Sequence, residues 1–320
     1  MDAITKITPM LQQYLEIKEQ YPDTILFYRM GDFYEMFFED AVTAAKVLGI
    51  TLTSRSAKDE VNKIPMCGVP FHAVTGYLGR MIKAGFRVAI CEQVEDPKEA
   101  KGIVKREVVR VVSPGVTTDD QLLDAKTDCY VSALTINRRS SKEWIAGLAF
   151  IDISTGRFHI SEIAFAPKEP APLIDQFTRL HPAELVIAQA EMERSSDLIS
   201  QLTMHLGQLC LTGRPDFHFE FQPAYATLTE HFRTTSLAGF GCETFTTAIC
   251  AAGSLIWYLR DTQKSDLAHI KQVSPLAHSG YLMIDDASRR NLELTETLIG
   301  GQRDGSLLSV LDQTATPMGA

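Results

Sequence analysis

Two β-strand patterns in the middle of the chain constrain its fold more than any other feature. They are YVSALTIN (130–137) and WIAGLAFIDISTGRFHISEI (144–163), both rich in β-branched and aromatic residues. The second contains a hairpin-like turn, Ser-Thr-Gly-Arg, at 154–157. Strand and helix patterns then alternate through DQFTRLHPAELVIA (175–188) to about residue 213. Because such alternation is typical of α/β domains, we predict one over residues 126–250.

The N-terminal part of the chain shows a similar alternation. Thr8 and Pro9 suit the N-cap and the first turn of a helix that ends near Pro22. Further strands are predicted at 24–37, 50–55, 86–94 and 105–115, helices at 37–49 and 73–85, and a polar loop at 56–63. This pattern predicts a mixed-sheet α/β domain over residues 1–113.

Turn and helix signals divide the rest of the chain. The sequence Ser-Pro-Gly at 113–115 and the polar stretch after it predict a linker at 114–125. FTTAICAAGSLIWYLRDTQ (245–263) and SRRNLELTETL (288–298) predict helices, so residues 251–320 are expected to begin a helical region. The last residues, LDQTATPMGA, resemble the start of another helix, and we therefore expect the chain to be a fragment of a longer protein.

Composition narrows the class of protein. Hydrophobic residues make up 45% and charged residues 22%, which is typical of globular domains. The sequence has no run of 18 apolar residues and no basic, apolar leader, so neither a membrane span nor a signal peptide is predicted. The six cysteines show no zinc-ligand spacing, and we expect reduced thiols in a cytoplasmic protein.

The net charge of −9 argues against a nucleic-acid partner, but the charge is unevenly distributed. Residues 1–113 carry 15 basic and 15 acidic groups, whereas residues 114–250 carry 10 and 17. Four basic residues lie within ten positions: Lys101, Lys105, Arg106 and Arg110. If these side chains gather on one face, the first domain can approach a polyanion.

The segment MGDFYEMF (30–37) brings an aromatic ring and a carboxylate together. Alternate residues of a strand share a face, so Phe33 and Glu35 point the same way and Tyr34 points the other way. One interpretation is a core Phe33 with Glu35 as a charge at the strand edge. A buried Glu35 would be costly, however, and an exposed face would make the pair a binding site. The pattern alone leaves both interpretations open.

An exposed aromatic side chain of this kind suits faulty DNA. It can enter between base steps from the minor groove, unstack them and kink the duplex. Bending a site by 40–90° costs on the order of 1–6 kcal/mol, and a stacked aromatic returns roughly 1–3 kcal/mol per base. A mismatch lowers the cost of unstacking. A carboxylate beside the ring is repelled by phosphates but can hydrogen-bond a displaced base, which adds selectivity.

Catalytic alternatives rest on weaker patterns. IDISTG (151–156) ends a strand with Asp152, as in ribonuclease-H-like folds where such an aspartate holds a metal. Two-metal catalysis needs further carboxylates, for which Glu184, Glu191 and Glu193 are candidates. The simpler interpretation is an aspartate beside a tight turn. GGQRDGS (300–306) has the glycine spacing of a P-loop but Ser306 in place of lysine, so a loop between helices is predicted.

Several stretches, in order along the whole chain, resemble the bacterial mismatch-repair family MutS. They are TPMLQQYLEIKEQYPDTILFYRMGDFYEMFFEDA (8–41), IPMCGVPFHAV (64–74), VAICEQVEDP (88–97), VVRVVSPGV (108–116), DISTGRF (152–158), RRNLELTETL (289–298) and LDQTATPMG (311–319). The stretch at 24–41 is highly specific. The resemblance implies a mismatch-recognition domain at 1–113, a linker at 114–125, a ribonuclease-H-like connector domain without nuclease activity at 126–250, and the start of a helical core, or lever, domain at 251–320.

The resemblance also implies roles for individual residues and partners. Phe33 would intercalate beside a mispaired base and Glu35 would contact that base. The residues expected to flank the DNA are Met30, Arg55, Met66, Arg106 and Arg110. MutL would dock on the connector domain. Full-length members bind ATP and Mg and form homodimers, but this fragment is expected to have no cofactor, no ATPase activity and weak DNA binding, and it could be a monomer.

Three hypotheses follow for function. The chain is a mismatch-binding fragment, a partner-docking module centred on the acidic middle domain, or a metal-dependent nuclease at Asp152. The first two are compatible with each other.

Overall fold

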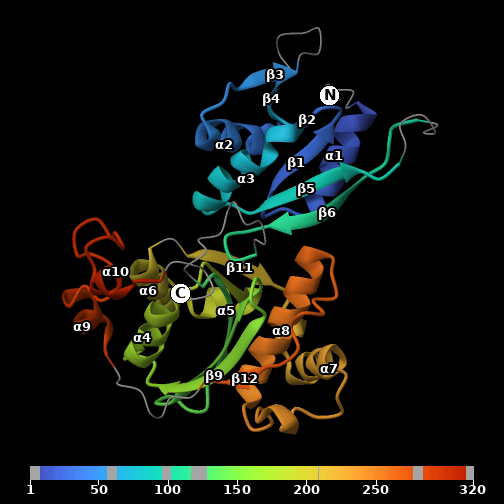
Figure 1. Cartoon of the computed structure of the whole chain (residues 1–320). Coiled ribbons are helices and arrows are strands. Elements are labelled where there is room, and N and C mark those ends of the chain that lie inside the picture. The colour runs from blue at the N-terminus through green and yellow to red at the C-terminus, as the bar shows by residue number, and fades with distance from the viewer. Residues whose placement is uncertain are drawn as a thin grey trace. The chain divides into compact units, whose positions relative to one another are not determined.

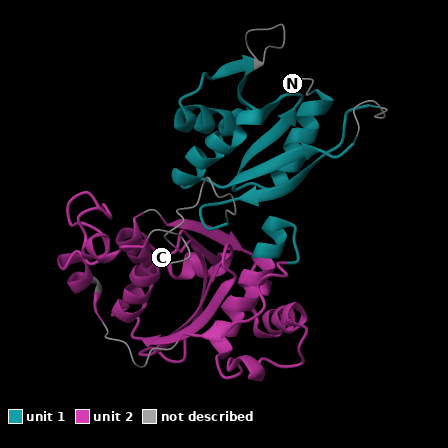
Figure 2. Cartoon of the chain, in the orientation of Figure 1, with its two compact units in different colours: residues 1–122, 259–266 teal, residues 123–258, 267–320 magenta. Residues whose placement is uncertain are grey.

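The computed structural model of the chain describes residues 8–55, 63–95, 102–116, 128–207, 209–276 and 284–314, without the side chains of Arg55 and Asp286. The chain forms two compact units (Figure 2). The first comprises residues 1–122 and 259–266, and the second comprises residues 123–258 and 267–320. Each unit contains a six-stranded mixed sheet with helices, which confirms the predicted α/β class.

The first unit is a sheet with helices on both faces. Its elements are α1 (Pro9–Gln20), β1 (Ile25–Met30), β2 (Phe33–Phe37), α2 (Phe38–Leu48), β3 (Thr53–Arg55), β4 (Ile64–Pro70), the 3-10 helix η2 (Phe71–Ala73), α3 (Val74–Lys83), β5 (Val88–Gln93) and β6 (Arg106–Val112). The strand order is β3-β4-β2-β1-β5-β6, and the pairing is antiparallel except between β1 and β5. Helix α1 covers one face, and α2 and α3 cover the other (Figure 1).

Local signals explain the helices of this unit. The Thr8 hydroxyl accepts a hydrogen bond from the Leu11 amide at 3.5 Å, and Pro9 opens the first turn of α1. Leu11 and Tyr14 recur at helical spacing and are buried against the sheet. Helix α2 ends at Gly49, whose φ of 63° is the left-handed conformation that glycine adopts without strain.

One prediction for this sheet is wrong, and one strand was missed. Residues 24–37 form two antiparallel strands and not one, because Gly31, with φ of 56°, turns the chain back. Strand β4 was not predicted, because Pro65, Gly68 and Pro70 interrupt its strand pattern. The predicted strand at 50–55 is shortened to β3, and the predicted polar loop at 56–63 lies outside the described residues except for its last position.

The second unit contains a meander that is extended by parallel strands. Its elements are β7 (Tyr130–Asn137), β8 (Trp144–Asp152), β9 (Arg157–Phe165), α4 (Ala171–Leu180), β10 (Glu184–Ala188), α5 (Gln189–Arg194), α6 (Ser196–Leu206), β11 (Cys210–Arg214), η3 (Asp216–Phe219), α7 (Phe221–Phe232), η4 (Ala238–Phe240), α8 (Thr246–Gln263), β12 (Ser274–Pro275), α9 (Asp286–Asn291) and α10 (Leu307–Leu311). The strand order is β11-β10-β7-β8-β9-β12. Strands β7, β8 and β9 are antiparallel, whereas β10 is parallel to β7 and β11 is parallel to β10.

Helices cover both faces of this sheet. Helices α4 and α6 pack on one face, and α8 lies against the other (Figure 1). A glycine is required where α8 approaches the sheet, because a Cβ atom at Gly147 would lie 2.3 Å from the carbonyl carbon of Thr247. The Thr135 hydroxyl donates to the Thr247 carbonyl at 2.7 Å, which fixes the start of the helix.

The C-terminal part differs from the sequence expectations in detail. Helix α8 passes through residue 250 without a break, so the predicted domain limit falls within a continuous element. The helix predicted at 288–298 ends at Asn291, and Glu293 has a φ of 47° that interrupts it. The segment at 300–306 is a loop between α9 and α10, as predicted. The predicted linker lies mostly outside the described residues, which exclude 117–127.

Two general predictions can be compared with the structure directly. All six cysteines are free thiols, and Cys67, Cys91 and Cys242 are buried. Within the described ranges, no helix combines the length and the apolar character that crossing a membrane requires.

Candidate nucleic-acid interface

The hairpin β1–β2 carries the residues that the sequence singles out. Met30 pairs with Phe33 across the two strands, and Gly31 and Asp32 form the turn between them. The carbonyl groups of both turn residues accept hydrogen bonds from neighbouring residues. The Arg29 Nε donates to the Gly31 carbonyl at 2.5 Å, and the Phe71 amide donates to the Asp32 carbonyl at 2.8 Å. The tip of the hairpin is thus held in one conformation by bonds on both sides.

Phe33 and Glu35 share one face of the hairpin. Phe33 is 48% exposed, whereas Tyr34 is 2% exposed and packs on the opposite face. Across the sheet, Glu35 pairs with Gly68 of β4 and Phe33 pairs with Pro70. The exposure of Phe33 decides between the two interpretations of the sequence: its ring is not part of the core.

Gly68 keeps the space between the two side chains open. A Cβ atom at this position would lie 3.3 Å from the Tyr34 carbonyl oxygen, 3.7 Å from the Glu35 Cγ and 4.0 Å from the Phe33 Cδ1, so any larger residue would occupy space beside both side chains. Sequence reasoning did not select Gly68. An isolated glycine within a strand pattern is the signal that could have found it, because it marks a close approach by a ligand or another backbone.

The same sheet face becomes core a few residues away from Phe33. Tyr28 and Phe37 are fully buried under α1 and contact Tyr14 edge to face, with ring centroids 5.5 Å and 5.0 Å away. Met30 and Met66 are half-buried at the margin of this cluster. Met30 pairs with Phe33 and so borders the exposed ring, whereas Met66 pairs with Phe37, four residues further along β2 on the same face.

A polar and aromatic cluster supports the hairpin from its other face. The Arg29 guanidinium lies 3.4 Å from the centroid of the Phe71 ring and 5.6 Å from that of Tyr34. The Tyr34 hydroxyl donates to Glu92, whose other oxygen lies 3.8 Å from Arg29. Burial, reinforced by the Glu92 carboxylate, raises the pKa of Tyr34, so this phenol stays protonated and continues to donate.

A buried carboxylate at the start of α2 joins α1 and α2 to the sheet. Asp40 is 6% exposed and accepts hydrogen bonds from the Leu26 amide at 2.9 Å and the Tyr14 hydroxyl at 3.2 Å. Its second oxygen receives the Lys18 ammonium at 2.9 Å. Burial, and next the Asp40 charge, raises the pKa of Tyr14. Asp40 thus connects three elements behind the exposed hairpin.

Arg106 is held by the protein itself. It is 9% exposed, and its guanidinium donates to the carbonyls of Arg29 at 2.7 Å and Val104 at 2.9 Å and to Gln13 at 3.2 Å. Its guanidinium carbon also lies 4.9 Å from the centroid of the Tyr28 ring. These contacts give Arg106 a structural role under α1, and the DNA contact that the resemblance implies for it stays a prediction.

Arg106 and Arg110, two of the four basic residues that lie close together in the sequence, do not gather on one face of the sheet. A β-bulge between Ile90 and Cys91 shifts the register of β6, so Arg110 pairs with Ile90, which belongs to the core on the opposite face from Arg106. Arg110 is exposed. The Lys105 ammonium lies 2.6 Å from Glu107, and Lys101 lies outside the described residues. Arg55 ends β3, and its side chain is outside the described part of the chain.

The carboxylates of the nuclease hypothesis are engaged by the second unit. Asp152 is buried, and its Oδ1 accepts from the Ser154 amide at 2.8 Å and the Ser154 hydroxyl at 2.6 Å, which closes the β8–β9 turn. Glu184 accepts from Thr212 and Tyr258, each at 2.6 Å. These contacts, and the absence of any cluster of three or more metal-ligating side chains among the described residues, give the nuclease hypothesis no support.

The loop at 300–306 does not fit a nucleotide. Ser306 stands where a P-loop has lysine, and its hydroxyl accepts from the Ser309 amide at 3.2 Å as the cap of α10. Helix α10 has only five residues, too short to present the helix N-terminus that a P-loop uses.

Comparison with known proteins matches both units. A family model described as MutS domain I matches residues 8–121, and one described as MutS domain II matches residues 129–271. The DNA mismatch repair protein MutS of Lachnoclostridium phytofermentans is 43% identical over 317 residues, which cover 99% of this chain and 33% of that protein. The protein of the same name from Desulforapulum autotrophicum is 45% identical over 318 residues, covering 99% of this chain and 35% of the relative.

These matches place the chain in the class of proteins that carry MutS domains I and II in succession. The chain belongs to the MutS family. It spans about a third of the length of the relatives it matches.

Proposed function

We propose that this chain binds mismatched or looped double-stranded DNA, with Phe33 wedging beside the mispaired base and Glu35 hydrogen-bonding it. The observation that carries the proposal is the position of Phe33, a ring that is 48% exposed at the tip of a hairpin held on both sides. The relatives, which are named DNA mismatch repair protein MutS, support the same role.

The ordered conformation of the hairpin affects the free energy of DNA binding. A wedge that is already ordered loses little conformational freedom on binding, so more of the stacking energy remains for the deformation of DNA. Stacking returns roughly 1–3 kcal/mol per base, comparable to the lower part of the bending cost. Binding is therefore favoured only where mispairing has already reduced that cost. Glu35 lies half-buried beside the ring, where a base displaced by Phe33 would come within its reach.

Two variants test this proposal. Fluorescence anisotropy at a stated low salt concentration compares a G·T duplex with its matched duplex for the wild type, Phe33→Ala and Phe217→Ala. Phe217 is 60% exposed and belongs to the second unit, so it controls for the loss of an exposed ring. Phe33→Ala is expected to weaken mismatch binding by about 1–3 kcal/mol, or roughly five- to 150-fold, with no change for Phe217→Ala.

The outcome that overturns the proposal is equal binding to both duplexes by the wild type, or an unchanged G·T affinity in Phe33→Ala. Glu35→Gln tests the proposed role of Glu35 separately from that of Phe33. It keeps hydrogen-bonding capacity but removes the charge, so it is expected to raise the affinity for the matched duplex and to narrow the discrimination.

The other predicted site residues fall into three groups. We propose that Met30 and Met66 contact the DNA near the wedge, because Met30 pairs with Phe33 and Met66 lies further along the same face of the sheet. We propose that Arg55 and Arg110 contact phosphates, in which case replacing either would lower the slope of log K against log salt by about 0.9. Arg106 is proposed to act on DNA only through the hairpin that it supports.

The second unit supports a finer fold assignment. We propose that it is a ribonuclease-H-like connector domain, because an antiparallel meander is extended on one side by two parallel strands, in the order β9-β8-β7-β10-β11. The domain limits at 1–113, 114–125 and 126–250, and the start of a core or lever domain at 251–320, are proposals of the same kind.

The acidic middle of the chain favours a second function, that of a partner-docking module. Residues 114–250 carry 10 basic and 17 acidic groups. We propose that MutL docks there, that the longer parent protein is a cytoplasmic homodimer, and that ATP and Mg bind elsewhere in that parent. Capture of purified MutL by the 320-residue chain, weakened by rising salt, is the expected result, and no capture at low salt would exclude this docking.

A further inference from the structure

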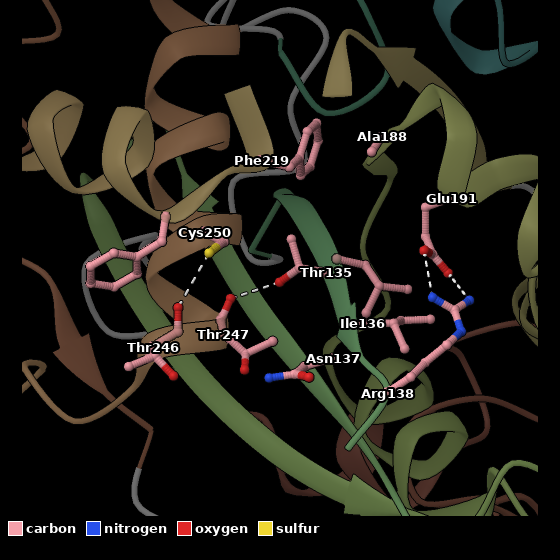
Figure 3. A pocket seen from close by; sticks show the side chains of 12 residues that line it. Thr135, Ile136, Asn137, Arg138, Ala188, Glu191, Phe219, Thr246, Thr247 and Cys250 are labelled. Carbon is pink, nitrogen blue, oxygen red and sulfur yellow. Dashed lines mark hydrogen bonds and ion pairs between the residues drawn. The ribbon is translucent and has the colours of Figure 1, made fainter. Parts of the chain in front are cut away.

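The second unit contains a cavity of about 480 Å³ that none of the proposed functions uses (Figure 3). It is lined by Leu134, Thr135, Ile136, Asn137, Arg138, Ala188, Glu191, Phe219, Phe221, Thr246, Thr247 and Cys250. Its volume is within the range of about 300–1,000 Å³ that is usual for small-molecule sites. Four elements that are distant in sequence contribute to its walls, namely β7, the end of β10 with α5, the segment around η3, and α8.

The position of the cavity in the sheet is one where α/β proteins bind ligands. Strands β7 and β10 are parallel neighbours, and the cavity lies at their carboxyl ends, at Asn137 and Ala188. After β7 the chain turns to β8 on one side, and after β10 it passes through α5 and α6 to β11 on the other side. Connections that diverge in this way open a crevice between the two strand ends.

The charges around the cavity are already neutralised by the protein. Arg138 forms a bidentate ion pair with Glu191, with nitrogen–oxygen distances of 2.9 Å and 2.6 Å (Figure 3). The first amides of α8, which could otherwise bind an anion, donate to Glu162 instead, from Thr247 at 2.6 Å and from Ala248 at 3.1 Å. An anionic ligand would meet the Glu191 carboxylate in the wall, an arginine already paired with it, and helix amides already bonded to Glu162, so the walls favour an uncharged ligand.

The remaining walls favour an aromatic ligand with a polar edge. Phe219 and Ile136 give apolar surface, and Asn137 contributes a carboxamide with a donor and an acceptor side by side. An asparagine carboxamide matches the N6 and N7 edge of adenine in a bidentate manner. The Cys250 thiol donates to the Thr246 carbonyl at 3.3 Å, and burial raises its pKa to about 11, so it remains a neutral part of the wall.

From this combination we propose that the cavity of the second unit binds an uncharged purine, as the free base or nucleoside. Its adenine edge faces Asn137, and its rings lie against Phe219 and Ile136. The site is separate from the hairpin of the first unit and does not depend on DNA binding.

Calorimetric titration of the 320-residue chain with adenosine, and separately with AMP, tests the proposal. Adenosine is expected to bind at one site with a Kd below about 1 mM, and AMP is expected to bind at least fivefold more weakly because its phosphate adds charge. Asn137→Leu is expected to weaken adenosine binding about fivefold or more, which corresponds to the loss of about 1 kcal/mol of hydrogen bonding. Asn291→Leu, the same change at an exposed asparagine of α9, is the control and leaves affinity unchanged.

Each result has a defined meaning. Absence of saturable adenosine binding, or AMP binding as tight as adenosine, overturns the proposal. Equal effects of Asn137→Leu and Asn291→Leu also overturn it. If Asn137→Leu does not fold, amide NMR shifts in the wild type decide: adenosine must perturb the signals of Thr246 and Thr247, and their constancy overturns the assignment.

Discussion

Replacement of Arg106 distinguishes a structural residue from a DNA contact. Arg106→Ala removes three charge-assisted hydrogen bonds, to the carbonyls of Arg29 and Val104 and to the Gln13 side chain, and the contact with the Tyr28 ring. At about 1–2 kcal/mol for each bond and about 0.5–1 kcal/mol for the ring contact, with some return from water entering the site, the expected loss is about 4 kcal/mol. Arg106→Lys retains one bond and should lose about half as much.

Urea unfolding can assign this loss to one unit. Trp144 and Trp257 are the two tryptophans of the chain, and both belong to the second unit. The tryptophan fluorescence transition of Arg106→Ala should therefore coincide with that of the wild type, while the circular dichroism transition of the first unit moves to lower urea. Arg110→Ala, a change at an exposed arginine of the same strand, is expected to alter stability by less than about 0.5 kcal/mol.

The salt dependence of DNA binding tests the alternative, which is that Arg106 contacts a phosphate. A residue that contacts a phosphate lowers the salt slope by about 0.9 when it is removed. If Arg106→Ala leaves stability unchanged and lowers the salt slope, the structural assignment is wrong and Arg106 is a phosphate contact. The expected result is the reverse: a destabilised first unit and, under conditions where the variant is folded, an unchanged slope.

Three further changes have expected outcomes. Gly147→Ala places a methyl group 2.3 Å from the backbone of α8 and should destabilise the second unit by about 3 kcal/mol or more in urea unfolding, whereas Gly76→Ala in α3, with nothing within 4 Å, should be neutral or stabilising by up to about 1 kcal/mol. Burial and then the charge of Arg157 lower the pKa of His159 from 6.5, so the imidazole binds a proton more readily in the unfolded chain than in the folded one. The second unit should therefore lose stability as the pH falls through 6.5 toward the folded pKa. His159→Gln should reduce that loss. Gly68→Leu should fill the space beside Phe33 and weaken G·T binding roughly fivefold or more, or about 1 kcal/mol, in the anisotropy assay, with circular dichroism showing a folded chain; an unchanged affinity would place the DNA elsewhere.

The patterns that predicted well are those set by local chemistry. Thr8 and Pro9 begin α1, Gly49 ends α2, and the turn before Arg157 separates β8 from β9, because capping and turn preferences act over a few residues. The shared face of Phe33 and Glu35 also followed from the strand period alone. Membership of the family rested on the order of whole stretches and is confirmed.

The predictions that failed depend on partners distant in sequence. Gly31 turns the chain inside a continuous apolar pattern, and only the pairing of β1 with β2 identifies a hairpin there. Strand β4 contains Pro65 and Pro70, which argue against a strand in the sequence, and only its pairing with β2 and β3 identifies it as one. The burial of Arg106 follows from the packing of α1 over Tyr28, which spacing along one strand does not reveal.

Because of the bulge in β6, the number of residues in this strand matters more for the fold than the identity of most of its side chains. Arg106 and Arg110 are four residues apart, and in a regular strand they would point to the same side. Val109 is the extra residue that separates them, so deleting it would restore regular alternation and turn one end of the strand over relative to the other. Either Arg106 would leave its carbonyl partners or Val111 would leave the core. Evolution of this edge strand should therefore accept many replacements but few insertions or deletions.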